Sequence, residues 1–275
     1  MRRRLLCNAT LPPTIYYTTT NGSQISDANT RLSSYIVSHT QEDNGEFKIV
    51  LNTSMRSIPN NCFYNQSTLS SIRFENMENV TSIGYGFLDG CKGLTEIDLS
   101  PLSQVKSIGS TFLNQCSSIE TIIFGDMPYL TALPNTLTSS TIPFRSTLKH
   151  IEFGNMPSIT SIGDRFLQSC SKLESLDLSP ISQVTSIGSW FLTNCTGLTS
   201  IDLSPLSQVT TIGNSFFSGC SALQTLTMPN TTGITSIGSD YLNSCNNLST
   251  IYCPTGTLET YQRLMSNRAS KMVEL

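Results

Sequence analysis

The sequence predicts a β-rich solenoid, a stack of short coils that share one hydrophobic core. Two observations carry this prediction. The line IDLSPLSQV stands at residues 97–105 and again at 201–209, and the variant LDLSPISQV stands at 176–184. An isoleucine followed by glycine also recurs with a period of twenty-five on both sides of one longer gap, at Ile83, Ile108, Ile162, Ile187, Ile212 and Ile237.

Two further copies complete the series. Leu133 follows Ile108 by one full period and precedes Ile162 by one period plus four, so one coil is longer than the others. Ile58 precedes Ile83 by one period. The chain of 275 residues therefore contains about eight coils. With strands about 4.8 Å apart, eight coils predict a slab roughly 40 Å long.

Each coil contains a segment that is predicted to form a short strand. In LTSIDL (198–203), Ile201 and Leu203 alternate with the polar Ser200 and Asp202. This period of two is typical of a strand with one buried face. Because every coil carries such a segment, the copies are expected to stack as a parallel sheet.

A loop with one apolar residue follows each strand. The loop is spelled either S-P-L/I-S-Q or in a second way, such as G-D-M-P-Y at 125–129. A single apolar residue in a polar loop is expected to pin that loop to the core, and methionine fills irregular gaps. The residues concerned are Leu102, Ile181, Leu206, Met77, Met127 and Met156.

The glycine that follows the recurring isoleucine suggests at first a turn with positive φ. Pro59 and Pro134 occupy the same place in two coils, and proline fixes φ in the ordinary negative range. We therefore expect one short helical or 3₁₀ turn here, with Phe191, Leu192 and Cys195 of F-L-x-x-C on one inward face.

The two ends differ from the repeat. Residues 15–25 and 35–51 each place Asn-Gly between β-prone runs, which predicts hairpins in an N-terminal cap. Pro254 is expected to end the last strand, and residues 257–265 fit a short helix that begins at Thr257. These signals divide the chain into a cap at 1–46, a solenoid at 47–253 and a C-terminal cap at 254–275.

Composition excludes some functions. A net charge of −3 and a pI near 5.4 argue against nucleic-acid binding, which needs clustered basic residues. The sequence contains no stretch of about 20 apolar residues, so no transmembrane helix is expected. The start MRRRLLCNATLPP carries positive charge, but its apolar run is too short for a signal peptide.

The repeat L-x-x-I-x-L, V-x-x-I-G-x-x-F-x-x-C resembles the BspA-like (Treponema-type) leucine-rich repeats over about residues 47–253. Residues 254–275 also look like the closing segment of such proteins from gut Bacteroidetes. The resemblance implies a right-handed leucine-rich-repeat solenoid with its parallel sheet on the concave face. It also implies a non-enzymatic surface or secreted protein that binds other proteins, including host cell-surface or matrix proteins.

The start MRRRLL resembles those of tail-associated proteins of gut phages, so a phage-tail or spacer role remains the alternative function. Neither the resemblance nor the composition indicates the oligomeric state.

Cysteine and histidine are the candidates for chemistry. Six of the nine cysteines share one repeat position, Cys62 and Cys253 occupy other core positions, and Cys7 lies outside the repeat. Stacked side chains about 4.8 Å apart are too distant for a disulfide, so we expect free buried thiols. The sequence contains no C-x-x-C pair that would indicate a metal site. His39 falls in the predicted cap, and His150 is expected to be a surface histidine at an exposed strand position beside Glu152. The sequence therefore predicts no catalytic, metal or cofactor site.

One column of exposed strand residues is the candidate binding site, here called the ladder. Its members lie between the last two core residues of each strand, and they repel one another where acids are neighbours. Recognition of a basic or mixed protein surface and simple solubility of an exposed sheet both explain the acids. The candidate residues are Arg73, Asp98, Ile123, Glu152, Asp177, Asp202, Thr227 and Tyr252, with His150 beside Glu152.

Overall fold

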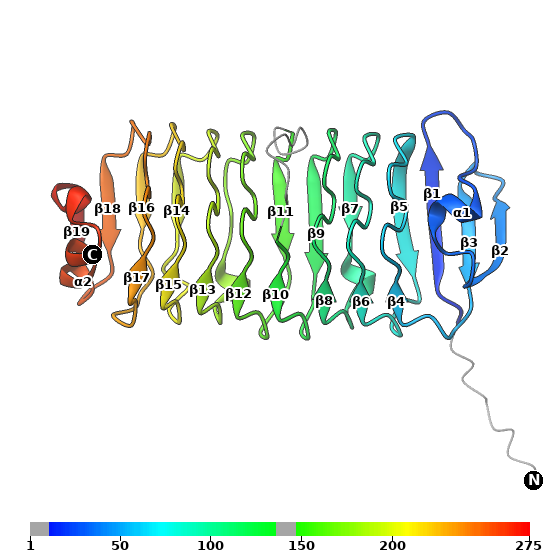
Figure 1. Ribbon diagram of the computed structural model, residues 1–275, viewed down its shortest axis with the longest axis horizontal. Coiled ribbons are helices and arrows are strands. Elements are labelled where there is room, and N and C mark those ends of the chain that lie inside the picture. Colours follow the sequence, from blue (N-terminus) through cyan, green and yellow to red (C-terminus); the bar gives the residue numbers. More distant parts are fainter. Residues whose placement is uncertain (1–10, 136–146) are drawn as a thin grey trace, which may run out of the picture.

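The computed structural model describes residues 11–135 and 147–275, which form an elongated stack of about eight coils (Figure 1). The coils contribute to two rows of strands around one core, and every coil except that of residues 174–177 has a strand in both rows. The rear row contains strands of two residues: β4 (Ser57–Ile58), β6 (Ser82–Ile83), β8 (Ser107–Ile108), β10 (Ala132–Leu133), β12 (Ser161–Ile162), β13 (Ser186–Ile187), β15 (Thr211–Ile212) and β17 (Ser236–Ile237).

The front row contains the longer strands: β5 (Leu69–Glu75), β7 (Glu96–Asp98), β9 (Thr121–Gly125), β11 (His150–Phe153), β14 (Ser200–Asp202), β16 (Thr225–Thr227) and β18 (Thr250–Cys253). Neighbouring coils pair in parallel wherever their strands are hydrogen-bonded. Leu133 pairs with Ile162 across the longer coil, as the sequence predicts.

The core contains the residues that the repeat predicts. Ile201 and Leu203 are buried, whereas Ser200 and Asp202 are exposed. The apolar residue of each loop is fully buried, and the 3₁₀ turns η1 (Ser100–Leu102) and η3 (Ser179–Ile181) hold two of these residues. Phenylalanines form a row through the stack, with ring centroids 5.5 to 6.3 Å apart from Phe74 to Phe166.

The segment after each glycine is not helical, so the prediction of a helical or 3₁₀ turn there is wrong. Every second residue has positive φ, as at Trp190 (59°), Leu192 (53°) and Asn194 (60°), and the same three positions repeat in the other described coils. Phe191, Leu192 and Cys195 are nevertheless fully buried. A left-handed conformation costs a non-glycine residue about 1 to 2 kcal/mol, so other contacts must compensate.

Hydrogen bonds between coils provide this compensation. The Leu192 N–H donates back to the Phe166 carbonyl at 3.3 Å, and the Trp190 N–H donates forward to the Asn214 carbonyl at 2.8 Å. The N–H groups of successive left-handed residues are therefore directed in turn to the two neighbouring coils. A helical turn would have directed them along its own axis, which explains why the local pattern misled the prediction.

The recurring glycine is needed because the backbone of the preceding coil lies too close for a side chain at this position. A Cβ on Gly188 would lie 2.6 Å from the backbone nitrogen of Asp164 in the preceding coil, and a Cβ on Gly109 would clash with that of Tyr85. Neither glycine has positive φ, in agreement with the argument from Pro59 and Pro134. The close approach allows the Gly188 N–H to donate to the Ile162 carbonyl at 2.9 Å.

The repeated cysteine bonds to the neighbouring coil. The Cys195 thiol donates to the Leu167 carbonyl at 3.1 Å, and the Cys220 thiol donates to the Leu192 carbonyl at 3.0 Å. Each acceptor belongs to a left-handed residue. The eight described cysteines are free and buried, as predicted, whereas Cys7 lies outside the described residues.

The N-terminal cap is an antiparallel sheet. β2 (Ile36–Gln41) and β3 (Phe47–Leu51) form the hairpin predicted around Asn44-Gly45. The hairpin predicted at 15–25 does not form, because β1 (Thr14–Thr19) pairs with β3 and with β5 instead. The cap thereby covers the edge of the first coil. A short helix, α1 (Asp27–Thr30), lies in the connection from β1 to β2.

The C-terminal cap imitates a further coil. The strand β18 ends at Cys253 and the helix α2 (Leu258–Leu264) begins after Thr257, as predicted. The 3₁₀ helix η4 (Ser266–Lys271) and the strand β19 (Met272–Glu274) follow, and β19 pairs in parallel with β18. The Arg268 guanidinium donates to the Leu242 carbonyl at 2.9 Å, at the position where a cysteine thiol donates in earlier coils.

We expect the free energy of unfolding to fall at alkaline pH. Burial raises the pKa of the Cys91 and Cys220 thiols to about 12, so the folded chain keeps protons that the unfolded chain loses above about 8.5. The contribution of these thiols to the free energy of unfolding is therefore fully present below about pH 8.5 and decreases as the pH rises above that value. Urea unfolding between pH 7 and 11 measures this effect. The variant C91S/C220S keeps hydroxyl donors and should flatten the decrease, and an equally steep decrease would contradict the assignment to these thiols.

We expect Arg268→Met to lower the free energy of unfolding by about 1 to 3 kcal/mol, because the buried Leu242 carbonyl loses its donor. Urea unfolding at neutral pH measures the change. Arg263→Met is the matched control, since Arg263 is exposed on α2 and its loss should change stability by at most about 0.5 kcal/mol. Equal effects of the two substitutions would show that the bond to Leu242 contributes little.

Candidate functional site

The front row brings most of the ladder into register. Asp98, Ile123 and Glu152 are paired neighbours on β7, β9 and β11. Asp202, Thr227 and Tyr252 are paired neighbours on β14, β16 and β18. Ile123, Thr227 and Tyr252 are half-buried, and the acidic members are exposed.

Arg73 is held by the N-terminal cap. Its guanidinium donates to both carboxylate oxygens of Glu46, at 3.1 and 3.0 Å, and to Glu75 at 2.5 Å. It also stacks on the Tyr16 ring, 3.6 Å from the centroid. These bonds lower the pKa of the Glu46 carboxyl. Arg73 therefore joins the cap to the first coil, a role that the sequence alone did not indicate.

Three aspartates of the ladder also shape the backbone. Asp98, Asp177 and Asp202 each accept the backbone N–H of the residue two positions later, at 2.8, 2.9 and 2.8 Å. This contact is an Asx turn, and it starts the S-P-L/I loop. Each carboxylate thus has a structural function, while its charge remains exposed on the front face.

Other charged groups on the front face extend the acidic character. Glu96 lies on β7, Glu120 directly precedes β9, and Glu174 occupies the position of Glu120 in a later coil, all three of them exposed. Lys149 pairs with Glu120 at 2.8 Å. His150 lies 3.8 Å from Glu152, and both of these side chains are well exposed. The alternation that identifies the ladder also places Glu96 on the exposed face of β7, although Glu96 is not among the candidate residues predicted from the sequence.

The ladder is interrupted at Asp177. Residues 174–177 make no backbone hydrogen bond to β11 or β14 within the part of the chain that the structure describes, and the front arrows of Figure 1 stop at β11 and resume at β14. The predicted strand is therefore absent in this coil. Pairing would place Glu152, Asp177 and Asp202 about 4.8 Å apart, a spacing at which like charges destabilise a sheet.

A hollow of about 340 Å³ lies beside this interruption, lined by Ser171, Lys172, Glu174, Gly197 and Thr199. Leu176 is only partly buried, whereas its counterparts Ile151 and Ile201 are buried. The middle of the front face therefore presents acidic side chains, unpaired backbone groups and some apolar surface together.

The two histidines differ. His150 is exposed, as expected. His39 lies in the N-terminal cap, and its side chain is only 4% exposed. Its Nδ1 lies 2.6 Å from Asp27 Oδ1, and its Nε2 lies 2.8 Å from the Tyr17 hydroxyl oxygen, which accepts the Ile25 N–H at 3.0 Å.

These bonds tie α1 and β2 to β1. Tyr17 is fully buried, and burial raises its pKa to about 12. A group of this kind has no access to a substrate, so the network is structural.

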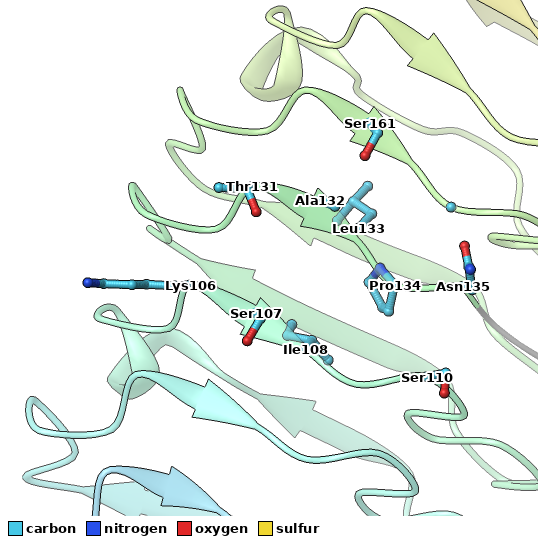
Figure 2. Close-up of a pocket in the computed structure, with 11 residues that line it drawn as sticks. Lys106, Ser107, Ile108, Ser110, Thr131, Ala132, Leu133, Pro134, Asn135 and Ser161 are labelled. Atoms are coloured by element: carbon cyan, nitrogen blue, oxygen red, sulfur yellow. The ribbon is translucent and has the colours of Figure 1, made fainter.

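A second hollow, of about 380 Å³, opens on the rear face between β8 and β10 (Figure 2). No backbone pairing joins these two strands, and the rear row is divided there into β4-β6-β8 and β10-β12-β13-β15-β17. Ser107 and Ile108 form one side of the hollow, Ala132 and Pro134 the other, and Ser161 of β12 lies beyond them (Figure 2).

Metal ligands do not gather anywhere in residues 11–135 and 147–275, where no group of three His, Cys, Asp or Glu side chains is placed to hold an ion. Within the same ranges, no helix has the length and hydropathy to cross a membrane.

Comparison with known proteins gives a family. The family described as "BspA type Leucine rich repeat region" matches residues 36–151 and 135–270. None of the curated proteins matches this chain. Solved structures that are similar to this chain include the following three.

The first of these is a leucine-rich cell surface protein from Faecalibacterium prausnitzii, with 16% identity, a TM-score of 0.40, and coverage of 80% of this chain and 76% of that one. The second is the leucine-rich repeat protein of T. pallidum, with 21% identity, a TM-score of 0.36, and coverage of 70% and 72%. The third is a leucine-rich repeat protein from Bacteroides ovatus, with 18% identity, a TM-score of 0.25, and coverage of 86% and 90%.

Leucine-rich repeat proteins are typically binding modules without enzymatic activity. With its regular coils, stacked front strands and matched residues over most of its length, this chain belongs to the BspA-type leucine-rich repeat family.

Proposed function

We propose that this protein is a non-enzymatic binding module that recognises a protein partner through its front face, as an adhesin at a bacterial surface. The observation that carries the proposal is the excess of exposed acidic groups on that face. Of the basic groups nearby, Lys149 and His150 each lie beside a glutamate, and Lys172 lines the hollow at the interruption. The acidic groups are Glu96, Asp98, Glu120, Glu152, Glu174, Asp177 and Asp202.

Such a face suits a partner with a basic or mixed surface. Charge complementarity accelerates encounter and excludes partners of like charge, while apolar contacts provide much of the affinity. Ile123 and Tyr252 offer half-buried apolar surface within the ladder. The interruption at Asp177 adds unpaired backbone groups, which can bond to a partner. Family membership supports protein binding in general and leaves the partner open.

Solubility is the competing explanation for the acids, and the Asx turns allow a clean test. Asparagine keeps the side-chain oxygen that accepts the backbone N–H, so an Asp→Asn change removes charge and preserves the turn. A change to lysine would remove both the negative charge and the side-chain oxygen that accepts the backbone N–H of the turn. The test variant therefore combines Asp98→Asn, Glu152→Gln, Asp177→Asn and Asp202→Asn.

We expect the wild-type protein to bind immobilised host matrix proteins or epithelial cells saturably, and more weakly at higher salt. The quadruple front-face variant should bind at least about tenfold more weakly, a change of about 1.4 kcal/mol, with an unchanged melting temperature. A control variant removes four exposed acids elsewhere and should bind as the wild type does: Asp43→Asn, Glu78→Gln, Asp240→Asn and Glu259→Gln.

Equal loss of binding in both variants would assign the effect to net charge and contradict a front-face site. Binding by the wild type and by both variants alike would move the site to the loops or caps. Absence of binding by all three proteins would favour the role of a structural or phage-tail spacer.

A further inference from the structure

The rear hollow between β8 and β10 is a place where the repeat fails in a defined way. In other coils, the residue after the recurring apolar residue donates its N–H to the preceding coil, as Gly109 does to the Ile83 carbonyl at 2.8 Å. Pro134 has no N–H at this position. Among the described residues, the Ile108 carbonyl therefore lacks the donor that the Ile83 carbonyl has.

The neighbouring bond is missing too. The residue two positions before the recurring apolar residue usually accepts, at its carbonyl, an N–H from the next coil. The Thr131 carbonyl, for example, accepts the Thr160 N–H at 2.9 Å. The Lys106 carbonyl has no such partner within the described ranges, and the Thr131 N–H has no acceptor there. The hollow thus contains two unpaired carbonyls, of Lys106 and Ile108, together with one unpaired N–H. Backbone groups of this kind gain free energy when a ligand satisfies them.

We infer that this hollow binds a neutral saccharide unit. The lining hydroxyl groups of Ser107, Ser110, Thr131 and Ser161 make no hydrogen bond within the described residues, so each can both donate and accept. Sugar hydroxyl groups have the same double capacity. Among the described residues, Lys106 is the single charged residue of the lining, and its side chain points away from the hollow (Figure 2).

The geometry disfavours other ligands. Carbonyls two residues apart in an extended segment are separated by about 6.7 Å. A metal ion holds each oxygen ligand within about 2.6 Å of itself, so one ion cannot reach both carbonyls. Strands of two residues are also too short to hold an added peptide strand, which needs a longer edge.

A sugar ring fits better, since its hydroxyl groups are spaced across several ångströms. Ala132 and Pro134 supply an apolar floor for the face of the ring. The volume of about 380 Å³ lies near the lower end of small-molecule sites, which suits one or two sugar units.

The experiment compares four proteins by saturation-transfer NMR and titration with neutral mono- and disaccharides, namely glucose, galactose, mannose, N-acetylglucosamine, lactose and maltose. Pro134→Gly restores the N–H toward Ile108 and should close the hollow. Ala132→Phe fills the hollow and leaves the backbone unpaired. Pro59→Gly is the matched control, because Pro59 stands at the same repeat position in the first coil, away from the hollow.

We expect at least one of these sugars to bind the wild type and Pro59→Gly equally, and to bind Pro134→Gly and Ala132→Phe at least about tenfold more weakly. Melting temperatures of all four proteins establish that each is folded. Absence of binding by the wild type to every sugar would overturn the inference. Undiminished binding by either Pro134→Gly or Ala132→Phe would also overturn it, since the sugar would then occupy another site.

Discussion

Hydrogen bonds between successive coils are the interaction on which the whole stack depends. Three residues of the turn segment in each described coil adopt a left-handed conformation, including bulky ones such as Trp190 and Leu192. No coil could hold this conformation alone, because its N–H groups point to the two neighbouring coils. The recurring glycine permits the close approach, and the buried thiol satisfies a carbonyl of the coil before it. Stability is therefore a property of neighbouring coils together.

The ends of the stack have to replace the missing neighbours. At the N-terminus, β1 pairs with β5 and covers the edge of the first coil, while Arg73 bonds the front face to Glu46 of the cap. At the C-terminus, β19 continues the front row, and Arg268 takes the place of a thiol. Each cap thus satisfies a particular set of backbone groups, in addition to shielding apolar surface from water. Because the caps bond to backbone groups that a neighbouring coil would otherwise satisfy, their sequences do not resemble the repeat.

Strand pairing between neighbouring coils breaks at three places: between β5 and β7 beside the N-terminal cap, between β11 and β14, and between β8 and β10. The second and third of these breaks coincide with the candidate binding sites. Between β11 and β14 on the front face, strand pairing fails where three acids would stand side by side. On the rear face, it fails where proline removes a donor. A perfect repeat satisfies its own backbone completely and offers a partner only side chains. An interrupted repeat also offers backbone donors and acceptors at one position along its length. A partner or ligand can therefore bind at that position in preference to the other coils.

The sequence by itself determined the period, the eight coils, the buried positions and the C-terminal helix, because these follow from hydrophobic spacing and local turn chemistry. It also identified the ladder, of which the structure brings six members into register. Only the tertiary structure decided the left-handed turns, the reason for the recurring glycine, the interruption at Asp177 and the partners of Arg73 and His39. These features depend on atoms that lie a full coil apart in the chain or across the cap, and the distance and direction between such atoms arise only when the coils are stacked.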